Sequence, residues 1–307
     1  IHERFKFIYP FVLFFHLFRD RVLIVNSFFN PIFGLLIPRV LMFLLKIKVF
    51  CITRGELQRN SLNIKYKKKY LFIRCFNLFN LKEIDFVFSD GNELKDSKFA
   101  SKVNIVKHSI LPNLPQYMDH EIFYDKEKLP VFTLLYLGRI DEDKNLLFLL
   151  SSLKQIKRKI KVDIYGPIRN SVYWNKCLSV IHSFESNIEI NYLGVLSRGQ
   201  FPVLVPQYHF LINPSFSENY GHSISESLSL GLPVIVSLGT PWKSLEILGL
   251  GFNLDHKVSS WSDFISNYKL EDYLGKYNPH SVRNRYLNYP LIKDSIILNK
   301  RFIDRII

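Results

Sequence analysis

Two glutamates and a polar loop mark the stretch of the chain that is richest in residues able to do chemistry. Glu218 and Glu226 stand eight positions apart within residues 208–242. The pattern predicts four consecutive elements: a strand over 210–213, a loop over 214–221, a helix over 222–230 and a strand over 234–236. A loop that opens directly into a helix leaves unpaired N–H groups and the positive end of the helix dipole facing outward. The stretch therefore predicts an anion-binding site.

A pair of cations follows an earlier predicted strand. Arg139 and Lys144 are five residues apart, in a turn that begins at Gly138. The planar guanidinium fork and the compact ammonium together suit the oxygens of a diphosphate. Gly166 and Gly194 follow two later strands and allow the backbone to approach a ligand closely. Because ligands of doubly wound parallel sheets gather at the carboxyl ends of the strands, we expect these groups to share one site.

Each of these residues also has a simpler interpretation when it is taken alone. Arg139 and Lys144 would more often be surface ion-pair partners of neighbouring carboxylates, and such pairs contribute little. Glu226 would more often lie on an exposed helix face, and His222 would more often cap a helix than act as a base. The order of these residues at successive strand ends favours the functional interpretation.

Strands and helices alternate along the chain, which predicts an α/β fold with parallel sheets covered on both faces. Besides the elements named above, predicted strands cover 22–25, 49–52, 85–89, 104–107, 131–137, 162–165 and 188–193. Predicted helices cover 32–45, 62–79, 145–157 and 172–184, and residues 258–307 are expected to be helical with breaks near Pro279 and Pro290. A proline-containing linker over 111–130 separates the predicted domains, which are 1–128, 129–257 and a C-terminal helical segment, 258–307.

The charge of the chain is positive and unevenly distributed. The 307 residues carry a formal net charge of +14, and residues 1–128 contain 21 basic against 12 acidic side chains. A basic first half predicts an anionic partner such as a phosphate, a nucleic acid or a membrane, although a merely soluble basic surface also explains it. Basic and aromatic residues interleave in the helix predicted over 62–79. This pattern suits anionic lipid headgroups as well as a solvated face over a core stripe.

Other features of the composition narrow the cellular setting. The apolar content of 48% is sufficient for packed cores and disfavours disorder. Cys51, Cys75 and Cys177 fit neither a disulfide framework nor a metal-ligand spacing, which favours a reducing cytosol. Residues 22–38 are uncharged, but they contain Asn and Pro and are shorter than the roughly 20 apolar residues of a spanning helix. We therefore expect a cytoplasmic protein, with peripheral association at the inner face of the membrane as an option.

The combined motifs resemble the nucleotide-sugar-binding half of the retaining glycosyltransferases of family 4, the group 1 glycosyltransferases, which have the GT-B fold. The resemblance covers residues 131–256 and rests on Gly138-Arg139 with Lys144-Asn145, Tyr165-Gly166, Leu193-Gly194-Val195, the Glu218 and Glu226 pair, Gly221-His222, Gly231-Leu232-Pro233-Val234 and Thr240-Pro241-Trp242. It implies two Rossmann-like domains facing across a cleft. It also implies transfer of a hexose-type sugar from a UDP- or GDP-sugar to a glycan or lipid-linked acceptor, with surface polysaccharide biosynthesis as the expected setting.

The resemblance also implies a role for each residue of the donor site. Arg139 and Lys144 would hold the diphosphate and stabilise it as the leaving group, Glu218 would face the hydroxyls of the donor sugar, and Glu226 would accept hydrogen bonds from the ribose. Further donor contacts would come from Gly138, Gly166, Gly194, Val195 and the backbone of Asn219, Tyr220, Gly221, His222 and Ser223. Fixed cations and a helix N-terminus are most useful where charge develops on the leaving diphosphate. Hence neither a metal nor another cofactor is expected, and the chain shows no compact Asp/His cluster.

A fainter resemblance extends upstream, where Thr53-Arg54-Gly55-Glu56 follows a predicted strand. It makes Arg54 and Glu56 the candidates on the acceptor side. The glycine-rich loop that the family usually carries after its first strand is not found. The N-terminal domain is therefore expected to lack its first strand and helix.

Other classes of function stay open at this point. A non-catalytic module derived from the same fold would hold a nucleotide sugar or a partner protein without turnover. A glycoside hydrolase also uses two carboxylates, but Glu218 and Glu226 would lie about 12 Å apart along an ideal helix, wider than the roughly 5–9.5 Å of paired catalytic carboxyls. A nucleic-acid binder is indicated by charge alone, because the basic helix lacks a groove-reading motif, so no nucleic-acid partner is expected.

Overall fold

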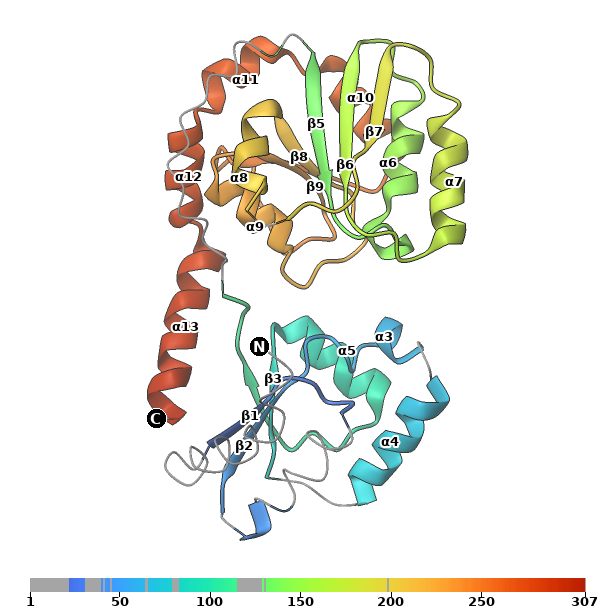
Figure 1. Ribbon diagram of the computed structural model, residues 1–307. Helices are drawn as coiled ribbons and strands as arrows, with labels where there is room; N and C mark the ends of the chain where they lie inside the picture. Colours follow the sequence, from blue (N-terminus) through green and yellow to red (C-terminus); the bar gives the residue numbers. More distant parts are fainter. Residues whose placement is uncertain are drawn as a thin grey trace, which may run out of the picture. The chain divides into compact units, whose positions relative to one another are not determined.

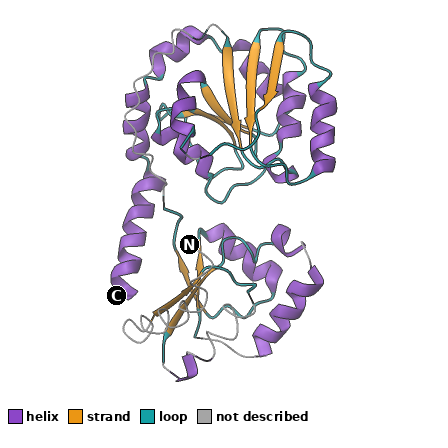
Figure 2. Ribbon diagram, in the orientation of Figure 1, coloured by secondary structure: helices purple, strands orange, loops and turns teal. Residues whose placement is uncertain are grey.

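The computed structural model describes residues 22–30, 40, 42–44, 46–63, 66–78, 83–114, 129, 131–197 and 199–306 (Figure 1). The chain divides into two compact units, Ile1–Asn113 with Ser295–Ile307 as the first and Leu114–Asp294 as the second. Each unit contains its own parallel β-sheet (Figure 2). The predicted α/β fold with parallel sheets is confirmed.

The first unit has a four-stranded sheet whose strands follow the order of the chain. They are β1 (Val22–Val25), β2 (Lys48–Ile52), β3 (Asp85–Phe88) and β4 (Lys107–Ile110). The described residues of this unit include the helices α3 (Arg59–Asn63), α4 (Tyr66–Leu78) and α5 (Gly91–Ser101). Phe28 is fully buried and makes edge-on ring contacts with Phe72 and Phe76, so the loop after β1 packs against α4 through aromatic rings.

The second unit has a six-stranded parallel sheet in the order β10-β9-β8-β5-β6-β7. The strands are β5 (Phe132–Leu137), β6 (Ile160–Tyr165), β7 (Ile188–Tyr192), β8 (Phe210–Asn213), β9 (Val234–Ser237) and β10 (Gly251–Leu254). The chain builds outward from β5 on one side and then returns to build outward from β8 on the other. The order of the strands therefore reverses between β5 and β8, which is where doubly wound sheets bind ligands.

Two groups of helices cover the two faces of this sheet (Figure 1). One group is α6 (Leu146–Leu153), α7 (Ser171–Ile181) and α10 (Val258–Asn267), in which α6 contacts both of the others. The other contains α9 (His222–Ser229), which contacts α12 (Pro279–Leu287). The sheet is buried on both faces, and β8 and β9 are accordingly apolar along almost their whole length.

The remaining elements are short connections and the end of the chain. The short connections are η3 (Glu142–Lys144), α8 (Phe201–Leu204) and η4 (Val205–Gln207). The end of the chain contains α11 (Leu270–Lys276) and α13 (Pro290–Ile306). The predicted breaks at Pro279 and Pro290 are helix starts, because proline fits the first helical position, where no backbone N–H is needed. The predicted C-terminal segment is shared between the units, since only Ser295–Ile307 belongs to the first.

Several predicted elements have different bounds. The strand expected over 104–107 is wrong: Ile105 N donates to the carbonyl of Val103 in a tight turn, and pairing with β3 begins only at Lys107. The helix expected over 62–79 is two helices, α3 and α4, and the helix expected over 145–157 ends at Leu153. Of the helix expected over 32–45, residues 40 and 42–44 are helical and the rest lie outside the described residues, as do residues 115–128 and 130 of the predicted linker.

Two of the three cysteines behave as buried apolar residues. Burial raises the pKa of the Cys51 thiol to about 12 and that of the Cys177 thiol to about 11. Both thiols therefore stay protonated near neutral pH, where a thiolate would be needed for reactivity. All three cysteines are free thiols.

Candidate functional site

Two loops meet at the switch point of the second sheet, one after β5 and one after β8. Phe216 N donates to the carbonyl of Asp143 at 3.1 Å, and the Asn145 side chain donates to the carbonyl of Pro214 at 3.2 Å. Asn145 is buried and has a left-handed backbone (φ 56°), so it turns the chain sharply from η3 into α6. The two predicted polar loops therefore form one continuous structure.

Lys144 and Glu218 lie at the centre of this structure. The Lys144 ammonium forms an ion pair with Glu218 Oε1, although the residues are 74 positions apart. The same oxygen accepts from Ser215 Oγ at 3.0 Å and from the Asn213 side chain at 3.4 Å. The two charged side chains are only 19% and 10% exposed, so this pair is far less hydrated than an ordinary surface ion pair.

Arg139 has a partner within its own loop. Its Nε lies 3.3 Å from Asp141 Oδ2, and 52% of its side chain is exposed. Asp141 also caps the short η3 helix by accepting from Lys144 N at 3.1 Å. In this structure Arg139 is therefore a surface ion-pair partner, as its simpler interpretation predicts. Its guanidinium is exposed, so most of its N–H donors stay accessible to a ligand.

Tyr136 ties the cation loop together and was missed by sequence reasoning. Its hydroxyl lies 3.2 Å from the carbonyl oxygen of Arg139 and 3.4 Å from that of Lys144. Burial holds the pKa of Tyr136 well above its ordinary value, so the phenol remains a hydrogen-bond donor. A tyrosine in a buried strand carries no signal in the sequence that separates this role from simple packing.

Replacing Tyr136 with phenylalanine should loosen the loop without opening a cavity. Loss of the hydroxyl leaves the carbonyl groups of Arg139 and Lys144 without this donor. We expect the affinity for a nucleoside diphosphate to fall about 3- to 10-fold, which corresponds to one neutral hydrogen bond. Isothermal titration calorimetry with UDP measures the change.

The matched control for this variant is Tyr208→Phe. Tyr208 is also buried, and its hydroxyl donates to Asp163 Oδ2 at 2.8 Å, away from the two loops. It should lower stability by at least as much, because its hydroxyl binds a carboxylate, and it should leave UDP affinity unchanged. If the Tyr136→Phe variant bound UDP as tightly as the unaltered protein, the positioning role of Tyr136 would be contradicted.

Three glycines form a row at the carboxyl ends of β5, β6 and β7. Gly138 N donates to the carbonyl of Tyr165 at 3.0 Å, and Gly166 N donates to the carbonyl of Gly194 at 2.8 Å. A Cβ at Gly166 would lie 1.8 Å from the carbonyl oxygen of Gly138, so only glycine fits there. Val195 follows the row and is 68% exposed, as expected for a residue that could contact a ligand.

The N-terminus of α9 directly follows the loop after β8. Gly221 precedes the helix with a left-handed backbone (φ 77°), and His222 is exposed at the first helical position. Tyr220 is buried, and its carbonyl accepts from Trp242 Nε1 at 2.6 Å. The Tyr220 ring is therefore packed inside the unit and is not open to a ligand. Asn219, Ser223 and Glu226 are half-buried, and the last two lie within α9.

The loop after β8 is supported by residues that the predictions did not include. Ser237 donates to the carbonyl of Ser215, and His256 Nε2 lies 3.2 Å from the same oxygen. The His256 ring stacks on Phe216 with centroids 5.1 Å apart. A Cβ at Gly239 would lie 2.0 Å from the carbonyl oxygen of Phe216. These contacts hold the backbone on which Glu218 is placed.

The acceptor-side candidates have well-defined structural partners in the first unit. Glu56 accepts from Ser27 Oγ at 2.9 Å and from Phe28 N at 2.5 Å, so it holds the loop after β1. Arg54 donates to the Asn26 side chain at 2.5 Å and is exposed. The acceptor role of Arg54 and Glu56 stays a prediction.

Glu93 is a further residue of this region that sequence reasoning missed. It is fully buried, and its carboxylate accepts from Thr53 Oγ1 at 2.8 Å, Gly55 N at 2.5 Å and Ser89 N at 2.7 Å. It therefore connects the loops after β2 and β3. Several hydrogen bonds to one carboxylate compensate for burial of its charge.

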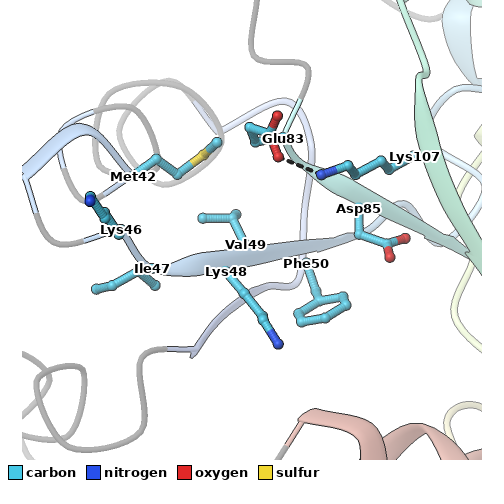
Figure 3. A pocket seen from close by; sticks show the side chains of 9 residues that line it. All are labelled: Met42, Lys46, Ile47, Lys48, Val49, Phe50, Glu83, Asp85 and Lys107. Atoms are coloured by element: carbon cyan, nitrogen blue, oxygen red, sulfur yellow. Dashed lines mark hydrogen bonds and ion pairs between the residues drawn. The ribbon is translucent and has the colours of Figure 1, made fainter.

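A hollow of about 540 Å³ lies at the other end of the first sheet (Figure 3). It is lined by the first residues of three strands, Lys48, Asp85 and Lys107, together with Glu83 and Lys46. Glu83 forms an ion pair with Lys107, and Asp85 accepts from Ser109 Oγ at 3.1 Å. Ligands of parallel sheets bind at the opposite, carboxyl ends, so we place no donor chemistry here.

The described residues contain neither a metal-binding cluster nor a membrane-spanning helix. No group of three or more His, Cys, Asp or Glu side chains in that part of the chain is arranged to hold a metal ion. Within the same residues, no helix is both long and apolar enough to cross a bilayer.

Comparisons with known proteins identify the class. The HepE protein of Anabaena, in complex with UDP-glucose, is 13% identical with a TM-score of 0.65, over 96% of this chain and 81% of that one. Sucrose-phosphate synthase from Thermosynechococcus elongatus is 14% identical with a TM-score of 0.66, over 98% of this chain and 78% of that one. No curated protein sequence matches the chain. The structural likeness shows that this α/β protein has the GT-B fold.

A similarity to one family follows from the sequence itself. Residues 120–248 match the family model for glycosyl transferases group 1. Over these residues the chain is similar to the group 1 glycosyltransferases, and the matched stretch contains the two loops, α9 and both glutamates described above. The resemblance to this group stated from the sequence is confirmed.

Proposed function

We propose that the protein transfers a hexose-type sugar from a UDP- or GDP-sugar, with retention of the anomeric configuration as in family 4. One observation carries this proposal: Lys144 from the loop after β5 meets Glu218 from the loop after β8, at the switch point of the sheet. This arrangement places a cation and a carboxylate, both shielded from water, where such folds bind nucleotides. The complex of HepE with UDP-glucose supports the choice of donor.

Lys144 and Arg139 would neutralise the diphosphate as the bond to the sugar breaks. The Lys144 ammonium would either leave Glu218 to pair with a phosphate oxygen or bind both at once. The exposed Arg139 guanidinium would bind two phosphate oxygens with its planar fork of N–H donors. The N-terminus of α9, with the backbone of Asn219, Gly221 and Ser223, adds the positive end of a helix dipole. Because these groups supply the positive charge, the reaction is proposed to need no metal.

The two glutamates would recognise different parts of the donor. Glu218 is proposed to accept hydrogen bonds from the sugar hydroxyls, since its second oxygen has no role in the contacts to Lys144, Ser215 and Asn213. Glu226 lies about one turn into α9 and is proposed to bind the ribose hydroxyls. Gly138, Gly166, Gly194 and Val195 would form the wall beside the base and the phosphates.

The acceptor is proposed to be a glycan or a lipid-linked glycan of surface polysaccharide biosynthesis, acted on in the cytoplasm. The basic, aromatic first unit supports an acceptor with anionic groups. Arg54 and Glu56 are the proposed acceptor-side residues. Arg54 is the stronger of the two, because Glu56 is held by the loop after β1.

A thermal-shift screen of UDP-, GDP-, ADP- and CMP-sugars tests the proposal. A ligand that binds only the native state at 100 times its Kd stabilises it by about 2.7 kcal/mol. A UDP- or GDP-sugar is expected to raise Tm by several degrees. No shift with any of the four classes would overturn the proposed donor.

Glu226→Ala is expected to weaken binding of the matching nucleotide sugar about 10- to 100-fold, as for loss of hydrogen bonds to a charged group. Arg139→Ala should have a smaller effect, because Arg139 is already paired with Asp141. Calorimetry measures both. Glu271→Ala is the control, because Glu271 is an exposed glutamate of α11. Unchanged affinity in both site variants would refute the assignment.

A non-catalytic module that binds a nucleotide sugar is the second candidate. It shares the donor site and predicts the same thermal shifts. Release of UDP that depends on an added glycan acceptor separates the two, because only a transferase consumes the donor.

A further inference from the structure

The exposed side of α4 has an unusual composition. We define the α4 face as Tyr66, Lys67, Lys68, Tyr70, Leu71, Arg74 and Leu78, all of which are exposed. The exposed fractions of Leu71 and Leu78 are 65% and 82%, and those of Tyr66 and Tyr70 are 58% and 42%. A solvated helix face normally carries polar residues instead, so this apolar surface requires an explanation.

The opposite side of α4 is fully used in packing. Ile73 and Phe76 are buried in the core of the first unit. Lys69 also turns inward, donating to the carbonyl of Ser61 at 2.6 Å and lying 4.9 Å from the Phe29 ring centre. It is therefore not part of the basic surface predicted from the sequence, and Lys65 lies outside the described residues.

The C-terminal end of α4 is anchored to another segment of the first unit. Asn77, near the end of the helix, donates to the carbonyl of Lys102 at 3.0 Å and accepts from Asn104 N at 3.1 Å. The Tyr66 and Tyr70 rings stack with their centroids 5.8 Å apart. Figure 1 shows α4 in the first unit, and the contacts of Asn77 fix the end of this helix.

The charges on the face indicate its partner. Around the helix axis, Lys67 and Arg74 lie between the two exposed tyrosines and the two exposed leucines. The α4 helix contains no acidic residue. Cations beside aromatic and leucine side chains suit the boundary between headgroups and acyl chains of an anionic bilayer. A protein partner of ordinary surface composition would not require this excess of one charge.

We propose that the α4 face docks the protein on anionic phospholipid, with Lys67, Lys68 and Arg74 at the headgroups and Leu71, Leu78, Tyr66 and Tyr70 entering the interface. This contact would bring the first unit to a membrane-borne acceptor. It does not depend on the donor site, which lies wholly in the second unit.

Vesicle co-sedimentation tests the proposal on the full chain. The probes are vesicles of phosphatidylcholine alone and of phosphatidylcholine with phosphatidylglycerol. We expect binding only to the anionic vesicles, weakened by salt. The combined variant Lys67→Gln, Lys68→Gln and Arg74→Gln should bind roughly 100-fold more weakly, from about 1 kcal/mol per cation. Leu71→Ser with Leu78→Ser should also lose most of the binding.

A second set of lysines provides the matched control, because a chain with a net charge of +14 attracts anionic vesicles through its whole surface. Lys154, Lys157 and Lys159 are exposed between α6 and β6, in the second unit. Changing all three to Gln removes the same charge and should leave most of the binding intact. Equal losses in both triple variants, or no loss in the leucine variant, would overturn the proposal. Unchanged thermal denaturation and circular dichroism without any ligand show that the variants are folded, and because this control uses no donor sugar, it keeps the result separate from the donor assignment.

Discussion

Lys144→Ala is expected to lower kcat/KM for sugar transfer about 100- to 1000-fold, the usual effect of removing one preorganised group that stabilises developing charge. Lys144 is 19% exposed and already fixed by Glu218, so it needs little reorganisation to meet a diphosphate. Its effect should exceed that of Arg139, which is half exposed and paired within its own loop. Steady-state release of UDP with a saturating acceptor measures kcat and KM.

Comparing two ligands separates contact with the diphosphate from support of Glu218. Lys144→Ala should weaken UDP and UDP-glucose alike. Glu218→Gln should leave UDP affinity intact and weaken only the extra binding of the sugar. Lys161→Ala is the control, because Lys161 also pairs with a buried carboxylate, Asp163, at 3.5 Å. If Lys144→Ala bound UDP as tightly as the unaltered protein, the proposed role of Lys144 would be wrong.

Gly166→Ala should destabilise the second unit by more than about 3 kcal/mol, because strain and overpacking act at one position. The backbone at Gly166 has φ of 149°, and the new Cβ would overlap the carbonyl oxygen of Gly138 at 1.8 Å. The backbone cannot move apart easily at either glycine, because Gly138 N donates to the carbonyl of Tyr165 and Gly166 N donates to the carbonyl of Gly194. Thermal denaturation should show Tm lower by about 6–12 °C for a unit of this size.

Gly194→Ala is the matched comparison for Gly166→Ala. Gly194 also has a positive φ, 80°, but no atom lies within 4 Å of its added Cβ. It should therefore show only the strain of the left-handed backbone, about 1–2 kcal/mol. Similar losses in the two variants would mean that the overlap at Gly138 relaxes and that the close approach of the loops is not required.

The class of the protein was accessible from sequence because its signals are local. Apolar strands alternating with helices, glycines directly after strands, and a loop running into a helix each depend on a few adjacent residues. The turn at Gly138 with its two cations and the start of α9 at His222 are examples, and both lie within the stretch that matches the family.

Elements whose bounds depend on distant partners were less predictable. The segment 104–107 has a pattern typical of a strand, but β4 begins at Lys107, where pairing with β3 becomes possible. The α5 helix has no regular apolar stripe, and its buried Glu93 is stable only because Thr53, Gly55 and Ser89 donate to it. Hydrogen bonds between separate segments decide such cases.

The sequence by itself determined the α/β architecture, the glycosyltransferase class and the residue types of the candidate site. Only the tertiary structure decided which of these residues touch: Lys144 pairs with Glu218, Arg139 with Asp141, and Tyr136 holds the cation loop. It also turned Lys69 inward and left Leu71 and Leu78 exposed on α4. The physical reason is that side-chain contacts depend on sheet order and loop closure, which bring together residues that are far apart in the chain.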